Sequence, residues 1–542
     1  YDNAEVTTVV PSPDGDVELV YDLGEQQVGY FDFELFAEAG VMVDIYEVEY
    51  VDADGRVQHT YGNRNGMRYV TRSGLNRFTS TKRRSGRYIF ITLRNQHAPV
   101  HLRLVRVIGS TYPVAEIGSF LCSDSILTEI WRISQHTLKL CMEDTFTDCP
   151  LYEQTLWVGD ARNEAAFAYP TFGALDIGRR CARLAAQSLE RYPIVGSQVP
   201  SCWDTLLPAW SFLWGISIWD YYVFTGDVAF LREMWPYVIR NLENSAALRD
   251  PESGLFAGPF WNMFDWSGID DEHEIVLHNS MLLVGAIDAA QKCADVLKDE
   301  ARAAWLADLR ADLRASINRL WDPEKRAYPD SVHEDGSPSE CTSQHTSFLA
   351  LLYDIVPEEH ATDVLENLVN PPEGMTRVGS PFAMMYAYEA LEKAHRFNEI
   401  IESIYDAYTP MLEAGATTVW EVFPSSQARP GGFPTRSHCH GWSSAPLYFL
   451  NRILLGIRPA DGDGTVYDIS PWVYKGLTWA KGSVATIRGA LHVSWQVQPQ
   501  AVVIQVDAPP GLQVRLIPNP SHRERDVIFK VRRSQSAFPL DS

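Results

Sequence analysis

The spacing of apolar residues divides the chain into three regions. Up to about residue 115, short stretches rich in Val, Tyr, Phe and Ile alternate with polar turns. Four of these stretches lie at residues 17–22, 29–36, 41–50 and 88–93. Short apolar stretches between turn sequences are typical of antiparallel strands. Residues 1–115 are therefore predicted to form an antiparallel β-sandwich, with the basic run Lys82–Arg84 at a solvated strand edge.

The apolar period changes after residue 116. In residues 126–142 apolar side chains recur every three or four positions, as on an amphipathic helix, and Ser123 or Asp124 is placed to cap it. Eleven further helical segments follow, at residues 160–170, 174–190, 207–225, 228–248, 272–297, 299–320, 342–354, 358–369, 378–393, 395–412 and 440–453. Twelve helices joined by alternating short turns and long loops predict an (α/α)6 toroid over residues 116–456. An irregular α-solenoid is the alternative, but the sequence has no repeat period to support it.

After Pro459 the alternation typical of strands returns, most clearly in residues 491–497 and 502–506. Residues 457–542 are therefore predicted to form a second antiparallel β-sandwich. The predicted fold is multidomain α+β, with a central (α/α)6 toroid flanked by N-terminal and C-terminal antiparallel β-sandwich domains.

Composition narrows the class of protein. The net charge of −24 argues against nucleic acid and anionic membranes as partners, because phosphate groups need a basic face. No apolar run reaches the roughly 18 residues that a membrane span needs. The eight cysteines lie far apart without a CxxC pair, so neither structural zinc nor a disulfide framework is expected. The chain begins at Tyr1 without a visible signal peptide, so we expect a soluble protein that is cytoplasmic or exported with its leader removed.

One segment, Asp148–Asp160 (DCPLYEQTLWVGD), combines carboxylates with large aromatic rings. Glu153 lies between a Tyr and Trp157, and such surroundings raise the pKa of a carboxyl group enough for it to donate a proton near neutral pH. A solvated loop glutamate is the alternative. Asp148 is either a ligand for sugar hydroxyls or a turn residue, and Asp160 is either a site residue or a helix N-cap. The segment indicates a sugar-cleaving site, provided that a second carboxylate lies elsewhere.

A candidate for that second carboxylate is Glu421, in the segment AGATTVWEVFP. Two carboxylates can hydrolyse a glycosidic bond, one as acid and the other as base or nucleophile. The adjacent Trp420 is expected to form a wall of the site. Downstream, His438 and His440 stand two residues apart, but no third metal ligand is evident. We therefore expect a histidine that hydrogen-bonds the catalytic carboxylate, and no metal site.

Two further loops place an aspartate beside a tryptophan. Trp203 and Asp204 are expected at the mouth of a helix, whereas the nearby Trp210 is expected in the core. Asp265 and Trp266, in PFWNMFDWS, form a candidate sugar platform, with a loop packed on the core as the alternative. The chain contains no GxGxxG, Walker, HExxH or GxSxG motif, which argues against the chemistries that those motifs carry.

These segments resemble those of the α-L-rhamnosidases of glycoside hydrolase family 78, over most of the chain. Members of that family carry the motif DCPxRDERxGWxGD, and DCPLYEQTLWVGD stands in its place. The resemblance implies that Glu153 is the general acid, with Trp157 four residues later. It also implies that Asp148 and Asp160 match the outer aspartates of the motif.

The family's second segment, GATTxWE, reappears as Gly415–Glu421, which implies that Glu421 is the general base. The resemblance implies substrate contacts for three further places: His440, Trp203–Asp204 in the position of GWGD, and Asp265–Trp266 in the position of GDW. The acid motif departs from the family pattern, because it is one residue shorter and has Leu, Tyr and Gln where the family has Arg, Asp and Arg. Those family residues help to hold the sugar's hydroxyls, so the identity of the sugar is left open.

The function that the resemblance implies is an inverting glycoside hydrolase that needs no cofactor. Its expected substrates are oligosaccharides or glycosides that end in an α-L-rhamnosyl or closely related deoxy-sugar residue. One alternative is an (α/α)6 hydrolase for another sugar, such as an unsaturated uronyl residue. The other is a carbohydrate-binding protein with a decayed catalytic site, against which the retention of Glu153 and Glu421 argues. The chain is compatible with a homo-oligomer.

Overall fold

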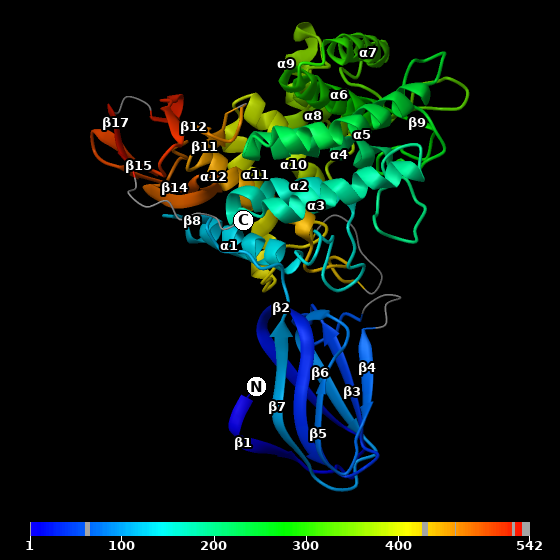
Figure 1. The fold of residues 1–542 in the computed structure, drawn as a ribbon, viewed down its shortest axis with the longest axis vertical. Coiled ribbons are helices and arrows are strands. Elements are labelled where there is room, and N and C mark those ends of the chain that lie inside the picture. Colours follow the sequence, from blue (N-terminus) through cyan, green and yellow to red (C-terminus); the bar gives the residue numbers. More distant parts are fainter. Residues whose placement is uncertain (1, 60–64, 425–431, 461, 523–525, 534–542) are drawn as a thin grey trace.

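The computed structural model describes residues 2–59, 65–424, 432–460, 462–522 and 526–533. These residues form an N-terminal β domain, a central helical domain and a C-terminal β domain, in the predicted order (Figure 1). The N-terminal domain extends from the helical domain as a separate lobe, whereas the C-terminal domain lies along the side of the helices (Figure 1). Residues 534–542 of the predicted C-terminal domain lie outside the described residues.

Within its described residues, the N-terminal domain consists of seven antiparallel strands: β1 (Asp2–Val9), β2 (Val17–Ala37), β3 (Met42–Val48), β4 (Gly66–Val70), β5 (Gly74–Thr79), β6 (Arg84–Arg94) and β7 (Val100–Gly109). They form one sheet in the order β1-β7-β2-β6-β3-β4, and β5 also pairs with β2. The 21-residue strand β2 pairs with β6 through its first half, and with β7 and β5 through its second half. The antiparallel prediction is confirmed, but the hydrogen bonds do not divide the strands into two sheets, so the sandwich stays a prediction.

The described part of the central domain contains all twelve predicted helices: α1 (Ser125–Leu140), α2 (Val158–Phe172), α3 (Leu175–Gln187), α4 (Pro208–Thr225), α5 (Val228–Ala247), α6 (Leu277–Leu297), α7 (Glu300–Asn318), α8 (Gln344–Leu352), α9 (Glu358–Val369), α10 (Pro381–Lys393), α11 (Phe397–Glu413) and α12 (Ala445–Ile453). Asp124 caps α1 by accepting hydrogen bonds from two backbone amides. The even-numbered helices contact one another in sequence, and α12 returns to α2. This closed inner ring confirms the (α/α)6 toroid. Two short strands, β9 (Ile275–Val276) and β10 (Ser331–Val332), pair beside the ring.

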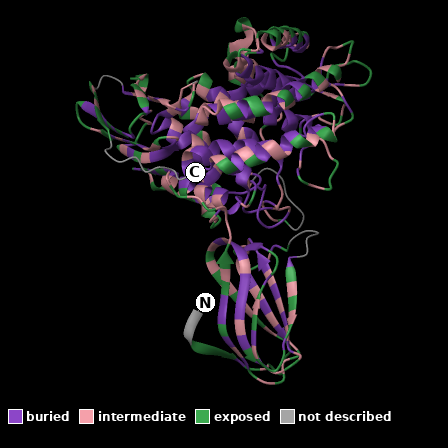
Figure 2. Cartoon of the chain, viewed as in Figure 1, coloured by how far each residue is buried: buried purple, intermediate pink, exposed green. Residues whose placement is uncertain are grey.

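The inner and outer helices differ in how much of their surface is apolar. The inner helix α4 is buried along most of its length, and its buried residues include the predicted core residue Trp210. The outer helix α7 buries one face, with Leu306, Leu309 and Leu313. A helix that is apolar all round is buried, whereas an amphipathic helix covers a core. Figure 2 shows the contrast, with buried residues concentrated in the middle of the helical domain.

The C-terminal domain has two sheets in its described part. Its strands are β8 (Ser119–Cys122), β11 (Ile457–Pro459), β12 (Val466–Ile469), β13 (Trp479–Thr486), β14 (Gly489–Val497), β15 (Ala501–Ala508), β16 (Gln513–Leu516) and β17 (Asp526–Arg533). The sheets have the orders β11-β12-β16 and β17-β15-β14-β13-β8. The prediction of a purely antiparallel domain is wrong, because β12 pairs with β16, and β15 with β17, in parallel. The chain leaves one sheet after β12, forms three strands of the other sheet, and returns at β16 in the original direction.

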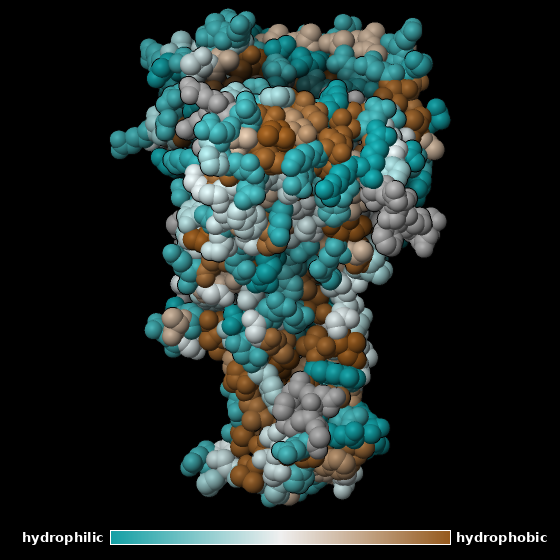
Figure 3. Space-filling view, turned by 90° about the vertical axis from the view of Figure 1, so that its left-hand side faces the viewer, coloured by the Kyte–Doolittle hydropathy of each residue, from teal (hydrophilic) through white to brown (hydrophobic). Residues whose placement is uncertain are grey.

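The surface corrects one further prediction. Arg83 and Arg84 are buried, not at a solvated strand edge, and Arg83 donates hydrogen bonds to the carbonyl oxygens of Ser110 and Leu140. Figure 3 shows hydrophobic patches among hydrophilic side chains over both the helical and the N-terminal domain. None of the helices in the described ranges is long and apolar enough to cross a membrane. All eight cysteines are free thiols, and six of them are buried.

Candidate active site

An aromatic cavity of about 230 Å³ lies at the end of the toroid where the inner helices begin. Eight predicted site residues line it: Asp148, Glu153, Trp157, Asp160, Trp203, Trp266, Glu421 and His440. The wall also contains Cys149, Tyr152, Leu207, Trp210, Trp261, Met263, Arg436, Ser437 and Trp442. Pockets for drug-sized ligands have volumes of about 300–1,000 Å³, so this cavity suits a ligand of one sugar ring.

The fold explains why residues so distant in the chain meet there. Residues 148–157 lead into α2, Trp203 and Leu207 precede α4, and Trp266 precedes α6. Residues 436–442 precede α12. The loops that enter the inner helices therefore come together at one face of the ring. A larger cavity, of about 1530 Å³, lies toward the C-terminal ends of these helices.

Several charged side chains of that larger cavity form ion pairs with one another. Arg162 lies 3.0 Å from carboxylate oxygens of both Asp220 and Glu389. Glu392 pairs with Arg452 and with a second arginine. These pairs neutralise one another. The smaller cavity instead brings together eight predicted site residues and has, within the described part of the chain, buried polar atoms without a hydrogen-bond partner at Asp160 and His440. The smaller cavity is therefore the candidate active site.

Glu153 lies in the turn before α2, and its side chain is 26% exposed. The indole Nε1 of Trp157 donates a hydrogen bond to Glu153 Oε2 at 2.7 Å. The guanidinium of Arg436 donates to Glu153 Oε1 at 2.8 Å and lies 4.9 Å over the ring of Tyr152. Tyr152 and Trp157 thus flank Glu153 as expected. The surroundings of Glu153 are less apolar than expected, because two polar groups donate hydrogen bonds to its carboxylate.

Asp148 and Asp160 are both buried, and both line the cavity. Asp148 accepts hydrogen bonds from the amide of Thr155 and the thiol of Cys149. Burial raises the pKa of both aspartates well above the usual range, and so does the negative charge of Glu153. The raised pKa favours the protonated form, and a protonated carboxyl group can both donate to and accept from a sugar hydroxyl.

The N-cap interpretation of Asp160 is wrong. α2 begins at Val158 with Trp157 as its N-cap residue, so Asp160 lies inside the first turn. The amide of Val158 donates to the carbonyl oxygen of Ser197 at 2.8 Å, and this contact fixes where the helix begins. Asp160 Oδ2 is buried and has no hydrogen-bond partner among the described residues. A buried polar atom without a partner is costly unless a ligand or water satisfies it.

Glu421 follows α11 and is 6% exposed. Its Oε2 accepts a hydrogen bond from the amide of Ser437 at 3.2 Å, and its own amide donates to the carbonyl oxygen of Ser437 at 3.0 Å. The indole of Trp442 donates to the Glu421 carbonyl oxygen. Glu421 is therefore held against the segment that also carries Arg436, and both glutamates face one cavity.

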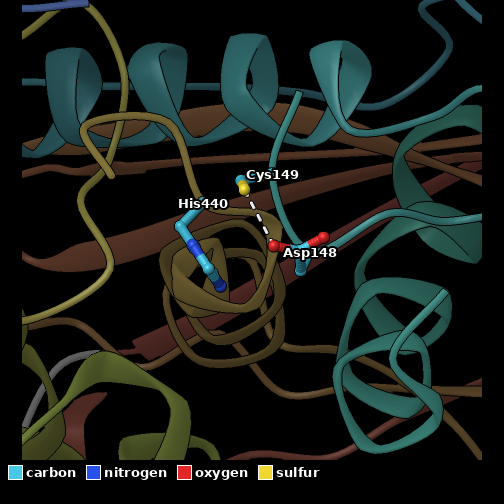
Figure 4. Close-up of side chains that lie close together, drawn as sticks. All are labelled: Asp148, Cys149 and His440. Carbon is cyan, nitrogen blue, oxygen red and sulfur yellow. Dashed lines mark hydrogen bonds between the residues drawn. The ribbon is translucent and has the colours of Figure 1, made fainter. Parts of the chain in front are cut away.

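His440 lies close to Asp148 and Cys149 (Figure 4), and all three side chains line the cavity. Burial, together with the nearby Arg436, holds the pKa of His440 well below its usual value, so the imidazole is neutral. Neither ring nitrogen has a hydrogen-bond partner among the described residues, so one can donate to and the other accept from a sugar.

The same three side chains have the donor types of a metal site, since their ligand atoms lie within 4.8 Å of one another. A cysteine binds metal as the thiolate. Burial and the charge of Asp148 raise the pKa of Cys149 well above its usual value, so the thiol stays protonated and donates to Asp148 at 2.8 Å. The cluster therefore favours hydrogen bonding over metal binding. A second group with metal-ligand atoms, Asp270, His273 and His333, lies outside the cavity.

Most of the chain matches a known protein family. Residues 115–454 match the bacterial alpha-L-rhamnosidase 6 hairpin glycosidase domain. The chain belongs to glycoside hydrolase family 78. Residues 457–530 of this family 78 chain also match the bacterial alpha-L-rhamnosidase C-terminal domain. The family resemblance that the sequence motifs indicated is thus confirmed.

Solved structures and curated relatives agree with this membership. The GH78 family rhamnosidase of Bacillus sp. GL1 superposes with a TM-score of 0.94 and is 39% identical, covering 98% of the family 78 chain and 56% of its own. A rhamnosidase from Klebsiella oxytoca with rhamnose bound shares the fold, with a TM-score of 0.70 and 21% identity over 81% of this chain and 88% of that one. An alpha-L-rhamnosidase of Formosa agariphila is 22% identical over 73% of this chain and 43% of that protein. The family 78 chain spans about half the length of the Bacillus and Formosa agariphila proteins, at 56% and 43% of their respective lengths.

Three predicted site residues of the family 78 chain do not line the cavity. Trp420 is buried behind Glu421, where its ring packs against Tyr50 and His438. Asp204 lies on the surface and pairs with a neighbouring arginine at 2.7 Å. Asp265 is buried below the cavity, so the alternative of a loop packed on the core holds for it.

Asp265 holds the loop that carries Trp266. Its Oδ2 lies 2.8 Å from His345 Nε2 and accepts from the amide of Gly379, and its Oδ1 accepts from the hydroxyl of Ser380. Asp265→Ala is expected to lower the free energy of unfolding by about 3 kcal/mol, because these buried donors lose their acceptor. Chemical denaturation measures the loss. A variant as stable as the wild type would contradict this structural role.

Sequence reasoning missed several cavity residues. Trp210 was expected only in the core, yet one side of its buried ring faces the cavity. Trp261 lies two residues from Met263 in a loop that was predicted to serve the site through other residues. Arg436 stands fifteen positions after Glu421, and this distance gives no sign that it reaches Glu153. For Trp261 and Arg436, the signal available in the sequence was a position in a loop that precedes an inner helix.

Proposed function

We propose that this chain is an inverting glycoside hydrolase that removes terminal α-L-rhamnosyl or closely related deoxy-sugar residues from oligosaccharides or glycosides. The observation that carries the proposal is that Glu153 and Glu421, each on a family 78 motif, line the same aromatic cavity. An inverting enzyme needs one carboxylic acid and one carboxylate on opposite sides of the sugar, with room for a water molecule.

In the proposed reaction Glu153 is the general acid. Its proton passes to the glycosidic oxygen while the bond from that oxygen to the anomeric carbon breaks. Glu421 is the general base and takes a proton from water, whose oxygen bonds to the anomeric carbon from the opposite face. The products are the free sugar with inverted configuration and the alcohol. Afterwards Glu421 returns its proton to solvent and Glu153 regains one.

The surroundings of Glu153 set a condition on this reaction. The indole of Trp157 and the guanidinium of Arg436 each donate to one of its two carboxylate oxygens. The oxygen that donates to the glycosidic oxygen must first be free of its contact. Arg436 is 35% exposed, whereas Trp157 is buried, so the arginine is the group that moves. In the proposed complex the substrate's glycosidic oxygen takes its place beside Glu153.

The other cavity residues suit the binding of a deoxy sugar. Asp148, Asp160 and His440 offer buried polar atoms for hydroxyl groups. Trp203 is 51% exposed at the cavity, where its ring can stack on an apolar sugar face. The side chain of Met263 gives the methyl group of a 6-deoxy sugar an apolar surface to contact. Trp420, Asp204 and Asp265 do not contact the sugar in this proposal.

The test is hydrolysis of a panel of 4-nitrophenyl glycosides that includes α-L-rhamnoside, α-L-fucoside, α-L-mannoside and β-D-glucuronide. We expect the α-L-rhamnoside or the α-L-mannoside, which share the arrangement of ring hydroxyls, to give the highest kcat/KM. Proton NMR during the first turnovers is expected to show the β-anomer of the released sugar. Release of the α-anomer would contradict inversion.

The cavity also holds a feature that favours the alternative sugar. Arg436 is a cation at the cavity wall, and an unsaturated uronyl residue carries a carboxylate that an arginine can bind. An unsaturated uronyl disaccharide therefore belongs in the panel, with loss of its ultraviolet absorbance as the signal. Turnover of that substrate alone would replace the rhamnosidase proposal. Binding of sugars without turnover of any would favour the decayed binding protein.

A further inference from the structure

The N-terminal β domain reaches the candidate active site through Glu49, which directly follows β3. The side chain of Glu49 is 6% exposed and lies between its own domain and the loop before α12. Its Oε2 accepts a hydrogen bond from the amide of His438 at 2.7 Å, and its Oε1 accepts from the side-chain amide of Gln26 at 3.2 Å. The carboxyl group is thus fixed from both domains.

The loop that Glu49 holds is the one that orients Glu421. His438 follows Ser437, whose amide donates to Glu421 Oε2. A single residue step therefore separates the amide bound by Glu49 from the amide bound by the proposed base. A shift of this loop moves both hydrogen bonds together.

Two neighbouring side chains of the β domain support the same loop. The ring of Tyr50 stacks on the imidazole of His438, with 4.2 Å between centroids and an angle of 6° between planes. The side-chain amide of Gln58 donates to the carbonyl oxygens of Thr435 and Arg436, at 2.8 and 3.0 Å. The β domain thus fixes the backbone of residues 435–438 at three polar atoms and one ring.

The charges around Glu49 favour its neutral form. Burial raises the pKa of Glu49 to about 8, and the charges of Glu421 and Asp148 act in the same direction, whereas Arg436 and the His438 amide lower it. At neutral pH a neutral carboxyl group still accepts the amide of His438, while Glu421 keeps the negative charge that a base needs. A second buried anion next to Glu421 would make that charge less stable.

We propose that Glu49 is a positioning residue for Glu421, and that the N-terminal β domain is thereby a working part of the catalytic site. This inference rests on the proposed role of Glu421 as base. Glu49 does not touch the cavity and takes no part in the proton transfers. It acts by fixing the loop whose Ser437 amide orients the base.

The test compares Glu49→Ala and Glu49→Gln with Glu47→Ala. Glu47 is a suitable control because it is also buried, stands two residues away on β3, and has Arg84 as its charged neighbour. Glu49→Ala is expected to lower kcat about tenfold or more with KM within about threefold, since the base loses its fixed orientation. Glu49→Gln keeps an acceptor oxygen and is expected to retain at least half of kcat.

The pH profile separates positioning from loss of stability. The acidic limb of kcat/KM reports the base of the free enzyme. In Glu49→Ala this limb is expected to move to higher pH, because the charged form of Glu421 loses part of a hydrogen bond. Glu47→Ala is expected to lower stability without moving the limb. A folded Glu49→Ala variant with the wild-type kcat and profile would overturn the inference.

Hydrogen exchange gives a readout that does not depend on activity. The amide of His438 is expected to exchange at least about tenfold faster in Glu49→Ala than in Glu47→Ala, because its acceptor is gone. If the wild type hydrolyses no glycoside, the proposed function fails while exchange still tests the contact. Unchanged exchange at His438 would overturn the positioning role whatever the activity.

Discussion

Replacing Glu421 by Gln is expected to lower kcat by about 10²–10⁴-fold, the usual contribution of a positioned general base. The amide side chain has nearly the same size and can still accept the hydrogen bond from Ser437, so the cavity keeps its shape. What is lost is the ability to take a proton from water. KM is expected to change little, because ground-state contacts to the sugar come from other residues. Initial rates on the best glycoside of the panel measure the effect.

A small anion provides the sharper version of this test. In Glu421→Ala, azide can enter the space of the missing side chain and attack the anomeric carbon without needing a base. The leaving alcohol departs with the proton of Glu153, and the expected product is the β-glycosyl azide. Asp204→Asn is the matched control, since Asp204 is an exposed carboxylate outside the cavity, and it is expected to act within twofold of the wild type. Wild-type turnover by Glu421→Gln would contradict its role as base.

Replacing Glu153 by Gln is expected to have an effect that depends on the leaving group. A disaccharide needs protonation of its glycosidic oxygen, so its hydrolysis is expected to fall by about 10²–10⁴-fold. A 4-nitrophenyl glycoside releases a stable phenolate and needs little protonation, so its loss is expected to be at least tenfold smaller. The ratio of the two losses, measured with purified variant and wild type, reports the acid role directly.

The Glu153→Gln test needs a control for the loss of the ion pair between Glu153 and Arg436. The amide of Glu153→Gln can still accept the indole hydrogen bond of Trp157 but no longer forms an ion pair with Arg436. Arg436→Gln removes the same ion pair and leaves Glu153 in place. If loss of the ion pair were the cause, both variants would lose activity equally on both substrates. Equal losses would therefore contradict the assignment of Glu153 as the acid.

The helices and the two glutamates were predictable because local sequence carries their signal. Helix α4 is apolar all round and α7 has one apolar face, and this difference already separates inner from outer helices in the sequence. Glu153 and Glu421 each lie beside aromatic residues within a short motif. No long-range information is needed to find such features.

The predictions that were wrong concern features that depend on contacts between distant segments. Asp160 reads as an N-cap, but the amide of Val158 binds the carbonyl oxygen of Ser197, so the helix begins earlier. The sequence predicts Arg83 at the surface, but it donates to the carbonyl oxygen of Ser110 in its own domain and to that of Leu140, in α1 of the helical domain. The parallel pair of β15 and β17 likewise depends on where the chain returns after visiting another sheet.

The strand β8 has a consequence for how such proteins can be rearranged by recombination. Ser119–Cys122 precedes α1 in the chain, yet it forms the last strand of the C-terminal five-stranded sheet through its pairing with β13. A crossover between the helical and C-terminal domains would leave β8 as an unpaired edge and strip one strand from the sheet. Recombination is therefore expected to keep the helical and C-terminal domains together, because β8 and β13 are far apart in the sequence but pair in one sheet.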